Sequence, residues 1–102
     1  MNRFPLCINL EDKNFLVVGS GMIARRKLLA ISEFTRNITV ISKEGAEGLA
    51  REGIKVVNKC FDDKDLEGMD FVITATGSRE QDEGIVAACK SRGIPVNAAD
   101  DR

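Results

Sequence analysis

The chain has 102 residues, a formal net charge of −1 and no histidine, which corresponds to one small domain. The near-neutral charge argues against a general nucleic-acid or membrane-surface binder, and no apolar run approaches the roughly 20 residues of a membrane span. Without histidine, carboxylates, lysines or a cofactor would have to carry any reaction. Because the N-terminus has no signal-peptide pattern, we expect a cytoplasmic protein with no nucleic-acid or membrane partner.

The first half of the chain predicts strands and helices in alternation. Residues 4–10 resemble a short strand or extended arm, and strands are predicted at 15–18 and 38–41. A helix is predicted over 22–34 because its apolar residues recur at helical spacing. Its expected buried face consists of Ile23, Ala24, Leu28, Ile31 and Phe34. A second helix is expected over 44–52, ending at Gly53.

The second half continues the same alternation. The predicted elements are a strand at 54–57, a short acidic helical turn at 62–68, a buried strand at 71–75, a helix at 79–92 with Ser78 as N-cap, and a strand at 94–98. Capping explains the acidic residues of the turn without a metal ion. Strands that alternate with helices over short connections predict right-handed crossovers and a parallel sheet. We therefore expect a single α/β domain over 1–102, with a five-stranded, doubly wound, Rossmann-like sheet of order 3-2-1-4-5.

The three cysteines, Cys7, Cys60 and Cys89, are widely spaced in apolar settings. This pattern predicts buried, reduced thiols. A zinc site would need closer cysteine pairs or histidine partners. No metal site is therefore expected.

A glycine motif of the form G-x-G-x-x-A joins the first strand to the first helix, with Gly19, Gly21 and Ala24 at its fixed positions. Such a motif allows a sharp turn and close approach of the backbone to a pyrophosphate at the helix N-terminus. Arg25, Arg26 and Lys27 follow in the first helical turn, where positive charge opposes the helix dipole, so an anionic ligand would be favourable there. The alternatives are a tight turn without a ligand and a solvated cationic face.

The ligand of such a sheet lies at the carboxyl ends of the strands. The predicted crevice therefore combines 19–23, the residues after Ile41, 74–77 and 98–101. After the second strand, Ser42, Lys43 and Glu44 occupy the place where NAD-binding proteins usually have an acidic residue. Glu44 or Ser42 could bind the ribose hydroxyls, whereas Lys43 could favour the 2′-phosphate of NADP. The residues leave this choice open.

Several segments together resemble the precorrin-2 dehydrogenase family, which forms the amino-terminal module of siroheme synthase. They are Phe4-Pro5-Leu6, the glycine motif 17–21 with Ala24, Arg26 and Lys27, Thr39-Val40, and 94–101 with the sequence Ile-Pro-Val-Asn-Ala-Ala-Asp-Asp. The likeness extends along nearly the whole chain. It implies NAD-dependent oxidation of the tetrapyrrole precorrin-2 to sirohydrochlorin in siroheme biosynthesis, with iron insertion in some members.

The resemblance also implies roles for individual residues. Met22 and Ile23 would contact NAD at the helix start, Lys43 and Glu44 would border the adenosine, and Asp100 would be the catalytic general base. The predicted cofactor-binding set is Gly19, Ser20, Gly21, Met22, Ile23, Ser42, Lys43, Glu44, Thr76 and Gly77.

Two departures from the family leave a second interpretation open. The family usually has Ala-Thr-Asp-Asp where this chain has Ala75-Thr76-Gly77-Ser78. Family members also continue beyond the aspartate into a dimerisation segment and a substrate-binding helical region, which this sequence does not include. We expect a homodimer for a full-length member. The alternative is an NAD-binding regulatory or sensing module without turnover, and a third interpretation is a structural domain with no dinucleotide affinity.

Overall fold

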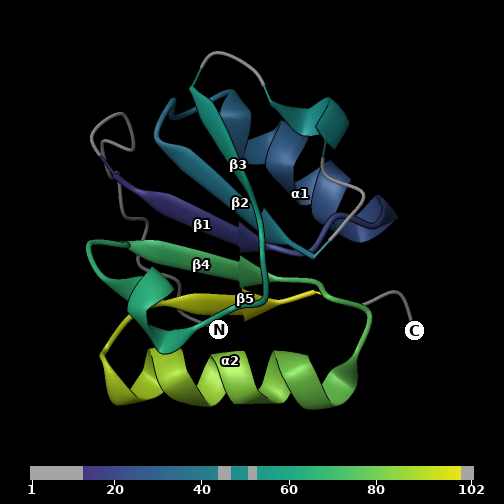
Figure 1. The fold of residues 1–102 in the computed structure, drawn as a ribbon. Helices are drawn as coiled ribbons and strands as arrows, with labels where there is room; N and C mark the ends of the chain where they lie inside the picture. Colours follow the sequence, from purple (N-terminus) through teal and green to yellow (C-terminus); the bar gives the residue numbers. More distant parts are fainter. Residues whose placement is uncertain (1–12, 44–46, 51–52, 100–102) are drawn as a thin grey trace, which may run out of the picture.

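Five strands form one parallel sheet in the computed structural model, which describes residues 13–43, 47–50 and 53–99. The strands are β1 (Phe15–Val18), β2 (Ile38–Ser42), β3 (Ile54–Asn58), β4 (Phe71–Thr74) and β5 (Val96–Ala98). Their order is β3-β2-β1-β4-β5 (Figure 1). The central strand β1 pairs in parallel with β2 on one side and β4 on the other. The predicted fold class and strand order are therefore confirmed.

Helices α1 (Met22–Ser32) and α2 (Arg79–Ser91) cover opposite faces of this sheet (Figure 1). Because side chains alternate along a strand, β1 supplies both layers of the core. Phe15 and Val17 pack with the α1 residues Ala24 and Leu28. Leu16 and Val18 pack with the α2 residues Ile85 and Cys89. The sheet is therefore buried on both faces, as a parallel sheet requires.

Two short 3₁₀ helices, η1 (Glu47–Leu49) and η2 (Asp63–Leu66), complete the fold. The acidic turn was predicted at η2. The helix predicted over 44–52 differs, because within that segment the described residues form only the single turn of η1 and Ala50 is not helical. Glycines at 45, 48 and 53 disfavour a continuous helix here. Residues 44–46 and 51–52, like the predicted arm at 4–10, lie outside the described residues.

Two details of the remaining elements correct the prediction. Helix α1 ends at Ser32, and the Phe34 amide donates to the Ile31 carbonyl in a turn beyond the helix. The Phe34 side chain has consequently left the buried face and is 58% exposed. Strand β5 begins at Val96 rather than at residue 94, because Pro95 has no amide to donate to a ladder. No helix among the described residues is long and apolar enough to cross a bilayer.

Candidate functional site

A cleft of about 760 Å³ opens at the carboxyl edge of the sheet. Its walls come from the ends of four strands and from the first half of α2, in the segments 18–21, 41–43, 59–63 and 76–85. A second hollow, of about 380 Å³, lies at the amino edge and includes Asn14, Arg36 and Lys55. We assign the candidate site to the carboxyl edge, since open α/β sheets bind their ligands there.

Gly19 forms the turn that leaves β1, and its own backbone requires glycine. Its φ is +120°, and a Cβ at this position would overlap the Ala75 carbonyl, whose carbon would lie only 2.7 Å away. The close approach is between two segments of the chain, the end of β1 and the residue after β4. Because Gly19 has no side chain, the ends of β1 and β4 can lie side by side at the cleft.

Gly21 differs from Gly19 because no protein atom requires glycine there. It is the N-cap of α1 with φ −73°, which any residue can adopt, and a Cβ would meet nothing within 4 Å. The first backbone hydrogen bond of the helix runs from the Arg25 amide to the Gly21 carbonyl (3.0 Å). The amides of residues 22–24 precede that bond and are the orphan donors of the helix N-terminus. A phosphate group fits this combination of open space and donors.

Met22 and Ile23 were predicted to contact the cofactor, but their side chains are not part of the described lining of the cleft. Met22 is 70% exposed, and Ile23 packs against the core under α1. Any contact from these two residues would therefore come from their backbone amides.

Ser20 joins the glycine turn to the neighbouring strand. The Ser42 hydroxyl donates to the Ser20 hydroxyl at 2.9 Å, and Nε of Arg25 donates to the Ser20 carbonyl at 3.0 Å. The Arg26 guanidinium lies 3.9 Å from the Met22 sulfur. Arg25 and Arg26, two of the three cations in this segment, therefore both contact the chain at the start of α1. Lys43 is exposed and lines the cleft beside Ser42. The Arg25 side chain thus stabilises the turn, and Lys43 places a positive charge on the cleft wall.

The loop between β4 and α2 forms another wall. Thr76, Gly77 and Ser78 line the cleft, and Gly77 has φ +82° in open space. The Ser78 hydroxyl accepts from the Gln81 amide (3.3 Å), which confirms the predicted N-cap of α2. Beneath the loop, Oδ1 of Asp82 accepts from the Thr76 amide (3.1 Å) and hydroxyl (2.9 Å). The Asp82 carboxylate of α2 therefore fixes the loop through Thr76.

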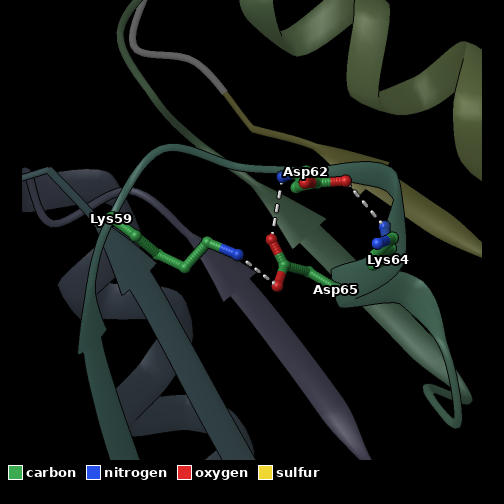
Figure 2. Close-up of polar contacts among 4 residues, drawn as sticks. All are labelled: Lys59, Asp62, Lys64 and Asp65. Atoms are coloured by element: carbon green, nitrogen blue, oxygen red, sulfur yellow. Dashed lines mark hydrogen bonds and ion pairs between the residues drawn. The ribbon is translucent and has the colours of Figure 1, made fainter.

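The segment after β3 forms a wall that the sequence did not predict. It contributes Lys59, Cys60, Phe61 and Asp63. Figure 2 shows how it is fixed: the Lys59 ammonium pairs with Asp65 at 2.7 Å, and the Asp62 amide donates to the other Asp65 oxygen at 2.8 Å. The only available signal was the general rule that the carboxyl ends of parallel strands share one edge.

Of the two described cysteines, one lies in the core and the other at the cleft. Cys89 is buried, and that burial raises the pKa of its thiol. Cys60 is exposed at the cleft, so its predicted burial was wrong. It lies two residues after the end of β3, where the chain leaves the sheet. Cys7 lies outside the described residues.

Of the ten predicted cofactor-binding residues, seven line the cleft: Gly19, Ser20, Gly21, Ser42, Lys43, Thr76 and Gly77. Glu44 and Asp100 lie outside the described residues. The Ala99 amide donates to the Thr74 carbonyl (2.9 Å), which holds the residue before Asp100 at the carboxyl end of β4. Among the described residues, no group of three or more Cys, Asp or Glu side chains is arranged to hold a metal ion.

Comparison with known proteins gives consistent matches to one group. Residues 6–102 match a family model described as "Putative NAD(P)-binding". The chain is 34% identical to the siroheme synthase of Thioalkalivibrio sulfidiphilus and 35% identical to that of Methylococcus capsulatus, in each case over 98% of this chain. It covers only 21% and 22% of those two proteins.

A solved structure is also similar. "SirC, precorrin-2 dehydrogenase" superposes with a TM-score of 0.70 and 25% sequence identity, over 95% of this chain and 49% of that one. The chain thus spans about a fifth of the length of the curated relatives and about half of the length of the solved structure that it resembles.

Proposed function

The chain belongs to the NAD(P)-binding domain family of siroheme synthase and precorrin-2 dehydrogenase, and from this premise we propose that it is the cofactor-binding part of an NAD-dependent precorrin-2 dehydrogenase. The observation that carries the proposal is the open space at Gly21. This position lies at the N-terminus of α1, lines the 760 Å³ cleft and leaves a hypothetical Cβ without a contact. The fold does not need glycine there, whereas a bound pyrophosphate would.

A dinucleotide fits the donor set of the cleft. The amides at the start of α1 would bind the pyrophosphate, and the walls after β2 and β3 would border the adenosine. Asp63 lines this side of the cleft and could hold the ribose hydroxyls, which supports NAD. Lys43 lies on the same side and would instead favour the 2′-phosphate of NADP. We propose NAD as the cofactor.

The reaction would combine cofactor and carboxylate chemistry. Oxidation of the tetrapyrrole would remove a hydride and a proton: a nicotinamide held in the cleft would supply the hydride acceptor, and we propose that Asp100 accepts the proton. The hydrogen bond from Ala99 to Thr74 supports this role, since it brings the chain to the carboxyl edge one residue before Asp100. In a longer protein, we propose a homodimer in which segments beyond this domain help to hold the substrate next to Asp100. The cleft itself supports dinucleotide binding, so a module that binds NAD without turnover is the second candidate.

The proposal is tested by titrating the chain with NAD and NADP and comparing Gly21→Asp with Gly21→Asn. Both replacements are favourable N-caps, so the unfolding free energy should be maintained or raised by roughly a few tenths of a kcal/mol. The Asp variant should bind NAD roughly 10- to 100-fold more weakly, because its carboxylate would face the pyrophosphate. The Asn variant, which adds bulk without charge, should lose less. If the wild type does not bind either dinucleotide, the proposed function is wrong. Unchanged affinity in Gly21→Asp would overturn the site.

A further inference from the structure

Asp82 is the only acidic side chain that the described residues bury, with 7% of its surface exposed. It lies in the first part of α2, four residues after the N-cap Ser78. Its Oδ1 atom accepts three hydrogen bonds, from the Thr74 hydroxyl at 2.6 Å, the Thr76 amide at 3.1 Å and the Thr76 hydroxyl at 2.9 Å. All three donors belong to the end of β4 and the loop that follows it.

The helix itself does not require this carboxylate. Ser78 already caps the N-terminus of α2, and a buried position facing the sheet is ordinarily filled by an apolar residue at lower desolvation cost. What Asp82 adds is a rigid connection between α2 and the loop. The Thr76 amide and hydroxyl are both held by it, and the Ser78 amide in turn donates to the Thr76 hydroxyl at 3.2 Å.

This connection determines which groups the loop presents to the cleft. Thr76, Gly77 and Ser78 all line the cleft, and the Thr76 hydroxyl donates to Asp82. The loop also packs directly on the glycine turn, since the Thr76 Cα atom would lie 3.3 Å from a Cβ at Gly19. A shift of Thr76 would therefore move the wall of the cleft next to that turn.

We propose that Asp82 is a positioning residue for the nicotinamide half of the bound dinucleotide, an inference that rests on the proposed function. A doubly wound sheet binds the two halves of a dinucleotide on its two sides. The walls after β2 and β3 belong to the adenosine half, and the β4 side belongs to the nicotinamide half. The hydrogen bonds of Asp82 all lie on the β4 side. Its loss should weaken binding of NAD while leaving unchanged the affinity for ADP, which has the adenosine and both phosphates but lacks the nicotinamide riboside.

The test compares the affinities for ADP and NAD in Asp82→Ala, Asp82→Asn and Thr76→Val by calorimetric titration, with urea unfolding as a measure of folding. We expect Asp82→Ala to raise the NAD Kd about 10-fold and to change the ADP Kd by less than about 2-fold. Asp82→Asn keeps an acceptor oxygen and should restore most of the NAD affinity. If Asp82→Ala does not fold, Thr76→Val removes one donor from the same network and should give the same split, about 3-fold for NAD.

Asp70→Ala is the matched control. Asp70 also holds a backbone amide, that of Asn14 at 2.8 Å, but it lies just before β4, at the opposite edge of the sheet. This variant should lower stability without changing the ratio of the two affinities. If the wild type binds neither ADP nor NAD, the proposed function and this inference both fail. If the wild type binds both and the folded Asp82 or Thr76 variants lose ADP and NAD affinity equally, or lose neither, the positioning role alone is overturned.

Discussion

The two glycines of the motif show that one sequence pattern can contain two different physical requirements. Gly19 has a positive φ and no room for a side chain, whereas Gly21 has an ordinary φ and open space. The first glycine is required by the fold, whereas the fold does not require the second, which we assign to the proposed ligand site. A matched pair of substitutions should test the requirement of the fold at Gly19.

We predict that Gly19→Ala destabilises the protein by about 2–4 kcal/mol. The added Cβ would overlap the Ala75 carbonyl, which adds the cost of overpacking to the cost of a left-handed backbone. Urea unfolding followed by circular dichroism would measure the loss, with Gly77→Ala as control. Gly77 also has a positive φ but no neighbour within 4 Å of a Cβ, so its replacement should cost about 1–2 kcal/mol. Equal losses in the two variants would contradict the steric argument.

At the scale of elements, η2 holds the wall of the cleft after β3. Its capping box satisfies two backbone amides at the start of the turn: the Asp62 amide donates to the Asp65 carboxylate, and the Lys64 amide donates to the Asp62 carboxylate (Figure 2). Leu66 then anchors the turn in the core under α2. The same carboxylate of Asp65 that caps the turn also pairs with Lys59. Asp65 therefore has two structural roles, as part of the cap and as the partner of Lys59.

We predict that Asp65→Ala lowers the unfolding free energy by about 1–2 kcal/mol and that Lys59→Met lowers it by less than about 1 kcal/mol. The first variant loses both the cap and the ion pair, whereas the second loses only an ion pair that is partly open to solvent. Urea unfolding at low and high salt would distinguish them. The cap contribution should persist at high salt, and the ion-pair contribution should shrink. A loss in Lys59→Met as large as that in Asp65→Ala would show that the cap contributes little.

At the scale of the whole molecule, the strand order brings four chain segments to one edge. Because β1 lies between β2 and β4, the glycine turn is flanked by Ser42 on one side and by Thr76 on the other. The same arrangement directs the chain after β5 back to β4 through Ala99. The proposed cofactor site and the residue that precedes Asp100 thus lie at one edge, although no local segment contains both.

We predict that Asp100→Asn, made in a full-length protein that carries this domain, reduces the formation of sirohydrochlorin from precorrin-2 and NAD about 100-fold or more. Loss of a general base typically costs that much. The NAD affinity should not change, because the proposed cofactor-binding residues lie on other segments. Asp101→Asn is the neighbouring control and should retain activity within about 3-fold. Full activity of Asp100→Asn with normal NAD binding would exclude the catalytic role, and the NAD-binding module without turnover would then be the better interpretation.

The local pattern of the sequence was sufficient for the fold and for part of the site. Apolar runs bounded by turns predicted all five strands, and short connections between alternating strands and helices predicted the parallel order that the structure confirms. Glycine spacing identified the turn at Gly19, and the Ser78 cap was visible as a helix start. These features depend on neighbours within a few residues, which is why the chain alone reveals them.

Only the tertiary structure decided which side chains meet. Asp82 and Thr76 are six residues apart, but their contact depends on how α2 packs against β4. Cys60 and Lys59 lie at the cleft because β3 ends at the same edge as β1, and Phe34 is exposed because α1 ends two residues before it. Hydrophobic periodicity determines which face of an element is buried. The partners of a polar side chain depend instead on the register and packing between elements that are distant in the sequence.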